Sequence, residues 1–184
     1  MLLAGLIGGC AAAREPAVMQ IDHPVYQTSA ELFGKAMLVI EADVSTASRV
    51  ERLRAQPGTG DDPRANPQLG ITPEPPLDEG PPVTVRGVRI VAVFKGAARA
   101  GQDIEVQQPG GTIDGVEHRV EGAVPLRGGA RYVLFLETFP DSPAAQLSLV
   151  QGAYGVDAAG TLSALPGNPI SLTRADLDRL AAGR

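Results

Sequence analysis

The sequence predicts an all-β fold, a small Greek-key barrel of the OB type with a short helix at its C-terminus. Short segments alternate apolar and polar residues, and glycine or proline turns separate them. The first of these segments is long, and the second contains a glycine at which a strand bends. One capped helical pattern follows near the end of the chain. The length of 184 residues suits a single barrel domain, which we place at residues 25–184.

Residues 25–35 begin this domain and predict a short helical turn. Thr28 or Ser29 is a suitable N-cap, because its hydroxyl can accept a hydrogen bond from the first turn. Leu32 and Phe33 are expected to face inward.

Residues 36–53 predict a long strand with period-two alternation. One face carries the apolar side chains Leu38, Ile40, Ala42 and Val44. The other face carries the polar side chains Glu41, Asp43 and Ser45. A strand of this length is expected to bend.

Residues 54–82 differ in composition, because they hold eight of the 16 prolines and four of the glycines. Such a segment cannot bury enough apolar surface to offset the entropy of ordering it. We therefore expect a long disordered loop between the first two strands, and the fold tolerates its length because loop-closure entropy grows slowly.

Residues 83–96 predict a central strand, because both of its faces are apolar near Ile90, and Gly87 predicts a bulge within it. The remaining strands are expected at 103–108, 115–124, 131–137, 146–152 and 155–165, with turns at 109–111 and 159–160.

The last element is a helix with well-marked ends. Thr173 is the expected N-cap, and Asp176 completes a capping box three residues later. Leu172 and Leu177 have the spacing of a hydrophobic staple, and Gly183 ends the helix.

Met1–Gly9 is an apolar segment too short to span a bilayer, and it has the form of a secretion signal. Ile7-Gly8-Gly9-Cys10 resembles the lipobox of bacterial lipoproteins. The resemblance implies cleavage before Cys10, the only cysteine, and lipid on its sulfur and new amino terminus. Residues 10–24 would then be a tether. A plain secretion signal, or an ordinary apolar segment with a buried cysteine, is the alternative.

Three later segments, 91–106, 126–137 and 152–162, share a pattern with exported bacterial proteins of unassigned role and with netrin-like modules, such as the tissue inhibitors of metalloproteinases. The residues that carry this resemblance are Lys95, Gly96, Gly101, Leu126, Gly129, Tyr132 and Phe135. It implies the barrel. It does not imply inhibition, because inhibitors of that family use several disulfides and an unmodified amino-terminal cysteine.

The composition narrows the function classes. The net charge of -5 and the scattered basic residues argue against nucleic-acid binding, which needs clustered Lys and Arg. Glu41 with Asp43, and Asp103 with Glu105, share strand faces and have the oxygen ligands that calcium prefers. Such carboxylates ordinarily keep a strand face hydrated, which is the interpretation we favour. No cofactor or metal is expected.

The chain has two histidines, and only one is a candidate for a site. His23 lies in the expected tether. His118 falls on the apolar face of its strand, where it is either a ligand or base in the barrel mouth or a rim histidine satisfied by one backbone partner. The second interpretation is the simpler one, because no motif of a serine hydrolase accompanies His118.

The predicted function is that of an exported, membrane-anchored envelope lipoprotein, held at the cell membrane or outer membrane by lipid on Cys10. Its barrel is expected to be a non-enzymatic module that binds an unidentified envelope protein or small ligand. One alternative is a structural component of an envelope complex. Another is a hydrolase that uses His118.

Overall fold

The computed structural model describes residues 15–53 and 80–183. The predicted signal segment, Cys10 and residues 54–79 of the predicted loop lie outside the described residues. Within the described part, the predicted fold class is confirmed: the chain forms an all-β barrel with a short C-terminal helix.

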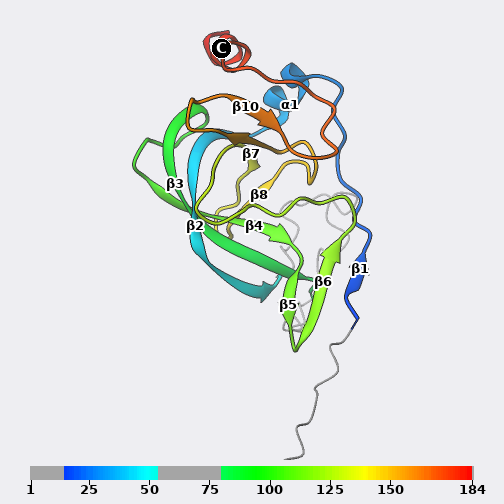
Figure 1. Ribbon diagram of the computed structural model, residues 1–184. Coiled ribbons are helices and arrows are strands. Elements are labelled where there is room, and N and C mark those ends of the chain that lie inside the picture. The colour runs from blue at the N-terminus through cyan, green and yellow to red at the C-terminus, as the bar shows by residue number, and fades with distance from the viewer. Residues whose placement is uncertain (1–14, 54–79, 184) are drawn as a thin grey trace, which may run out of the picture.

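Five of the described strands close into a ring (Figure 1). They are β2 (Leu38–Arg52), β3 (Pro82–Lys95), β4 (Asp103–Pro109), β7 (Arg131–Glu137) and β8 (Ala144–Gln146). The order around the ring is β7-β2-β3-β4-β8, and β8 pairs with β7 to close it. Every pairing is antiparallel except that of β4 with β8, so the strand order is that of a Greek-key barrel of the OB type.

The other strands are attached to this ring at two places. Next to β7, on the side away from β2, lie β9 (Ala153–Val156) and β10 (Leu162–Ala164). A separate small sheet has the order β1 (Ala17–Met19), β6 (Val116–Val120) and β5 (Gly111–Ile113). In Figure 1 this small sheet lies at the opposite end of the molecule from the helices.

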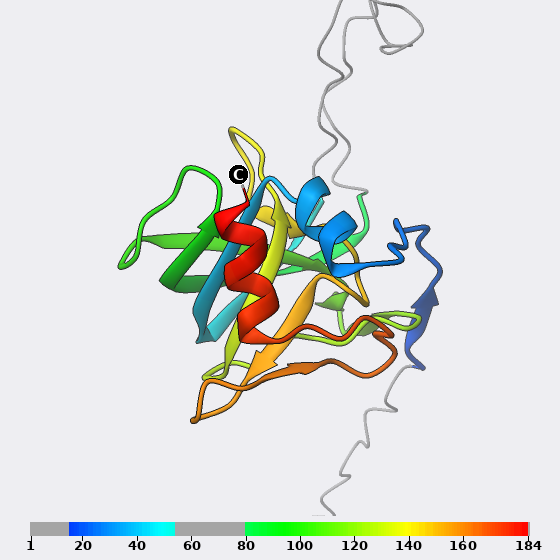
Figure 2. The same ribbon diagram turned by 90° about the horizontal axis from the view of Figure 1, so that it is seen from above.

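The helices begin where the sequence predicts capping. In α1 (Ser29–Lys35) the N-cap is Thr28, whose hydroxyl accepts from the Glu31 N–H at 3.1 Å. In α2 (Arg174–Ala182) Thr173 and Asp176 form the predicted capping box, and Gly183 is the C-cap. Figure 2 shows α2 lying across the outside of the strands, with α1 beside it.

Alternation along β2 and β7 sends side chains into two separate cores. The barrel interior holds the predicted apolar face of β2 and alternate residues of β7, namely Leu38, Ile40, Ala42, Val44, Tyr132, Leu134 and Leu136. The opposite faces of the same strands pack against the helices through Val39, Val133, Phe135, Leu32, Phe33 and Leu177. Both faces of β7 are therefore buried, as its continuous apolar sequence predicts.

The irregularity predicted near Gly87 is present. β2 and β3 lose register between Val44 and Ser48, and Gly87 faces the unpaired residues 45–47. Arg86 bonds to the carbonyl oxygens of Ser45 and Thr46 at 3.4 and 3.3 Å. A side chain at Gly87 would meet little, so the bend comes from the unpaired residues of β2 and not from the glycine.

Several predicted boundaries differ from the structure. Residues 17–19, predicted as tether, form β1, which pairs in parallel with β6. Pro82 begins β3 although the sequence places it in the loop. Residues 111–113 form β5 directly after a predicted turn. The strand predicted at 146–152 is instead the short β8 followed by a turn, because Gly152 N–H bonds back to the Ser148 carbonyl at 2.9 Å.

Candidate functional site

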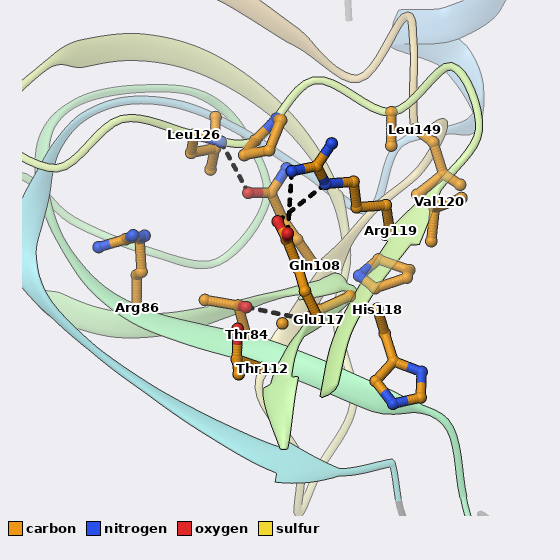
Figure 3. A pocket seen from close by; sticks show the side chains of 15 residues that line it. Thr84, Arg86, Gln108, Thr112, Glu117, His118, Arg119, Val120, Leu126 and Leu149 are labelled. Atoms are coloured by element: carbon orange, nitrogen blue, oxygen red, sulfur yellow. Dashed lines mark hydrogen bonds and ion pairs between the residues drawn. The ribbon is translucent and has the colours of Figure 1, made fainter. Parts of the chain in front are cut away.

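A cavity of about 470 Å³ lies between the end of the barrel and the β5–β6 hairpin (Figure 3). β3 and β4 contribute Thr84, Arg86, Gln108 and Pro109 to its lining. The hairpin contributes Gly111, Thr112, Glu117, His118, Arg119 and Val120. The segment that follows β6 closes it with Ala123, Pro125 and Leu126, and Leu149 completes the wall.

The cavity exists because β4 runs almost directly into β5. Gly110 and Gly111 have φ angles of 101° and 139°, which favour glycine. A Cβ on Gly111 would lie 2.8 Å from the Thr84 hydroxyl and 2.9 Å from the Val50 methyl groups. The Thr84 hydroxyl donates to the Gly110 carbonyl at 2.8 Å, which fixes the corner. The two glycines thus set the hairpin beside the barrel and form the floor of the cavity.

Gln108 holds the far wall of the cavity in place. Its Oε1 accepts from the Leu126 N–H at 2.8 Å. Its Nε2 donates to Oε1 of Gln146 at 2.6 Å and, more weakly, to the Val124 carbonyl at 3.4 Å. Both ends of the amide are therefore occupied by the protein itself. Gln108 is a positioning residue for the segment 124–126, not a group available to a ligand.

Glu117 and Arg119 form the main charged feature of the cavity. They share one face of β6, and Nε and an Nη of Arg119 donate to the two carboxylate oxygens at 2.8 and 2.9 Å. These bonds hold the pKa of Glu117 below its usual value and raise that of Arg119. Figure 3 shows both side chains extending from β6 toward Gln108, so the ion pair lies across the cavity.

His118 lies on the middle strand of the small sheet, between Gly111 of β5 and Ala17 of β1. It is half-buried, and its imidazole makes no hydrogen bond within the described part of the chain. Figure 3 shows it pointing away from Glu117 and Arg119. His118 therefore lines an edge of the cavity.

The other histidine, His23, contacts a serine that the sequence does not single out. Nδ1 of His23 lies 3.4 Å from Oγ of Ser148 and 3.2 Å from the Pro24 carbonyl. Ser148 is 1% exposed, and its Oγ also accepts from the Gln151 N–H. The pair is far apart in sequence, and no motif indicates it. Its burial and shared bonds are those of a structural contact between the N-terminal segment and the barrel.

Gln151 attaches the same N-terminal segment to the barrel. The buried amide accepts from the Tyr26 N–H at 2.8 Å and donates to the Tyr26 carbonyl at 2.9 Å. It thus pairs with the backbone of residue 26 as a neighbouring strand would. Residues 23–26, which the sequence assigns to the tether and domain start, therefore contact the turn at 147–151 through His23 and Tyr26.

The carboxylates of both acidic pairs, Glu41 with Asp43 and Asp103 with Glu105, are bound to arginines. Glu41 accepts from Arg174 at 2.6 Å, and Asp43 accepts from Arg131 at 2.7 and 3.0 Å. Asp103 pairs with Arg89, and Glu105 with Arg49. Among residues 15–53 and 80–183, no three His, Cys, Asp or Glu side chains gather where they could hold a metal ion. Glu41, predicted on a hydrated face, is instead 6% exposed beneath α2.

In the described ranges, neither helix is long and apolar enough to cross a membrane. No protein-family model matches the chain, and no curated protein sequence matches it.

Proposed function

We propose that the chain is a lipoprotein of a bacterial envelope, held at a membrane by lipid on Cys10, and that its barrel is a non-enzymatic binding module. The observation that carries this proposal is the position of the only cysteine, directly after the apolar run and two glycines of residues 1–9. Small residues before a cut are typical of exported chains. Two or more acyl chains give stable membrane binding, whereas one gives marginal binding.

The short stretch between Cys10 and the domain supports a role close to the membrane. Ala17 is fixed beside His118 by the pairing of β1 with β6, and it follows Cys10 by seven residues. Seven extended residues span at most about 25 Å. Lipid on Cys10 would therefore keep the small-sheet end of the barrel within that distance of the membrane, with the helices at the far end (Figure 1).

The arrangement of polar side chains favours binding over hydrolysis. A serine hydrolase needs an imidazole that accepts the hydroxyl proton and a third group that orients the ring. His23 directs a single nitrogen at both Ser148 and a backbone carbonyl, and His118 points away from Glu117. The cavity has apolar walls and a few polar groups, which is typical of ligand sites.

The resemblance to netrin-like modules implies the barrel fold and no inhibitory activity. In that family inhibition uses an unmodified amino-terminal cysteine, and lipid on Cys10 would block it. A ligand or partner at the cavity therefore fits the proposal better than a protease does.

Intact mass of the full chain expressed in bacteria tests the proposal. We expect the membrane fraction to contain a chain that lacks residues 1–9 and carries the mass of two or more acyl chains. Cys10→Ser is the control, and it should keep the leader and gain no acyl mass. A wild-type chain with the leader intact, or one that is cut but carries no lipid, would overturn membrane anchoring.

A further inference from the structure

We propose that the cavity beside the β5–β6 hairpin binds one acyl chain of a carboxylate- or phosphate-headed amphiphile, and that Arg119 holds the head group. The proposal deepens the proposed function, on which it rests for the source of the ligand. The apolar walls, the charge of the rim, the paired backbone and the position of β1 each support it.

The walls suit an acyl chain. Val120, Leu126 and Leu149 are 8%, 2% and 8% exposed, so they are part of the packed protein and turn only a small surface to the cavity. Pro109 and Pro125 add further apolar surface to the lining. The volume of about 470 Å³ falls within the range of about 300–1,000 Å³ typical of small-molecule sites.

The rim suits an anionic head group. Arg86 and Arg119 both line the cavity, although the chain as a whole has a net charge of -5. The planar guanidinium of Arg119 already holds a carboxylate through two parallel hydrogen bonds, and that carboxylate belongs to Glu117. The Arg119 side chain is 63% exposed and that of Glu117 is 45% exposed, and ion pairs in contact with solvent are weak. A ligand carboxylate or phosphate can therefore replace Glu117 on Arg119 at little cost.

The backbone around the cavity argues against an extended peptide as the ligand. Peptides that add to a sheet need an edge strand with unpaired N–H and C=O groups. Here β4 is paired with β3 as far as Pro109, and β5 is paired with β6. β6 is covered on its other side by β1, and the outer edge of β5 is only three residues long. So short an edge offers few backbone hydrogen bonds, and binding from side chains is what an acyl chain with a charged end satisfies.

The position of β1 indicates that the ligand comes from the membrane. β1 pairs with β6, whose residues line the cavity, and Cys10 lies within about 25 Å of Ala17 along the chain. The cavity is therefore at the end of the barrel that an anchor on Cys10 would hold next to the membrane. Free fatty acids and single-chain phospholipids share the required chemistry.

Fluorescence titration with a conjugated polyene fatty acid tests the site. The protein is the full chain carrying Cys10→Ser, so binding is measured without any lipid anchor and apart from the proposed function. We expect saturable binding and competition by palmitate or by single-chain phosphatidylglycerol. The stronger competitor identifies the source as free fatty acid or membrane lipid. A neutral fatty alcohol should compete at least about tenfold more weakly, because it lacks the charge that Arg119 recognises.

Three variants assign the contacts. Arg119→Gln should weaken fatty-acid binding about tenfold, since it removes the charge-assisted bonds. Glu117→Gln should strengthen binding several-fold, because the competing carboxylate is gone. Ala123→Phe should abolish binding by filling the cavity from its rim. Matched controls are Arg89→Gln, on the same strand as Arg86 but outside the lining, and Ala158→Phe on an exposed turn.

Equal affinity for fatty acid and fatty alcohol, or equal affinity of wild type, Arg119→Gln and Glu117→Gln, would overturn the role of Arg119. Absence of saturable binding to wild type would overturn the site itself. The loss of binding by Ala123→Phe is informative only if the unfolding midpoint of this variant matches that of wild type. If the midpoints differ, the variants of Glu117 and Arg119 decide the test.

Discussion

Apolar side chains are fully covered at the helix end of this barrel, whereas at the hairpin end they border a cavity. At the helix end, apolar side chains on the outer face of β2 and β7 are covered completely, and Val39, Val133 and Phe135 are 0% exposed. At the hairpin end, the residues around Leu126 enclose a cavity. A face that is covered by its own chain contributes stability, whereas a face that leaves space is available for a ligand.

The charges differ between the two ends in the same way. At the helix end, Glu41 is buried and Arg174 reaches it from α2 while also donating to the Gly160 carbonyl at 3.2 Å and lying over the Phe94 ring. At the hairpin end, the half-exposed Glu117 and the exposed Arg119 bond to each other along their own strand. The Glu41–Arg174 pair joins β2 to α2, whereas the Glu117–Arg119 pair lies within one strand and can exchange partners.

The largest effect that would sharpen this comparison is expected from Phe135→Ala. Phe135 is fully buried and makes edge contacts with Phe33 and Tyr154 at centroid distances of 6.5 and 5.8 Å. Its loss should lower the free energy of unfolding by about 3–5 kcal/mol. Val120→Ala, at the cavity wall, should cost only about 1–2 kcal/mol, because it removes fewer buried atoms and removes them next to existing space. Chemical denaturation measures both, and equal losses would contradict the contrast.

A smaller effect is expected from Arg174→Ala. Among the described residues, the change leaves the buried Glu41 carboxylate paired with Arg131 alone, at 3.7 Å. Breaking a buried pair costs about 3–5 kcal/mol, and we expect about 2–4 kcal/mol here because Arg174 is 34% exposed. Arg179→Ala on the same helix is the control, since Arg179 is 76% exposed. An unfolding midpoint unchanged by Arg174→Ala would show that α2 does not depend on this contact.

The smallest effect is expected on how the stability of the fold depends on pH. Hydrogen bonds from Arg131 lower the pKa of Asp43 in the folded chain. Asp43 therefore adds stability at pH values above its unfolded pKa of about 3.9, and this is lost as the pH falls through the folded value. Asp43→Asn should be less stable than wild type at pH 6 and should lose less stability on going to pH 2. The urea midpoints of unfolding of both proteins, measured between pH 6 and pH 2, give this difference in stability. Equal losses of stability for wild type and Asp43→Asn between pH 6 and pH 2 would contradict this role of Asp43.

Much of the barrel is predictable from the sequence, because alternation and helix capping depend on residues that are close together along the chain. Alternation in β2 places Leu38 and Ile40 inside, and the spacing of Thr173 and Asp176 gives the capping box. β1 and β5 have three residues each, too few to show a period. The cavity was not predictable either, because it depends on contacts such as Gln108 to Leu126 and on how β4 turns into β5. His118 lies at the edge of that cavity, and its place in the alternating pattern does not determine the direction of its side chain.

The closing strand of the ring has a consequence for how the barrel opens. β8 has three residues and is matched to β4 at Val106 and Gln107 and to β7 at Leu136 and Glu137. β2 and β3, by contrast, are matched along almost their whole length. The cylinder thus has one narrow seam, and separation there would convert it into a curved sheet while the long hairpin stays intact. Motions that admit water to the interior of the barrel would start at this seam.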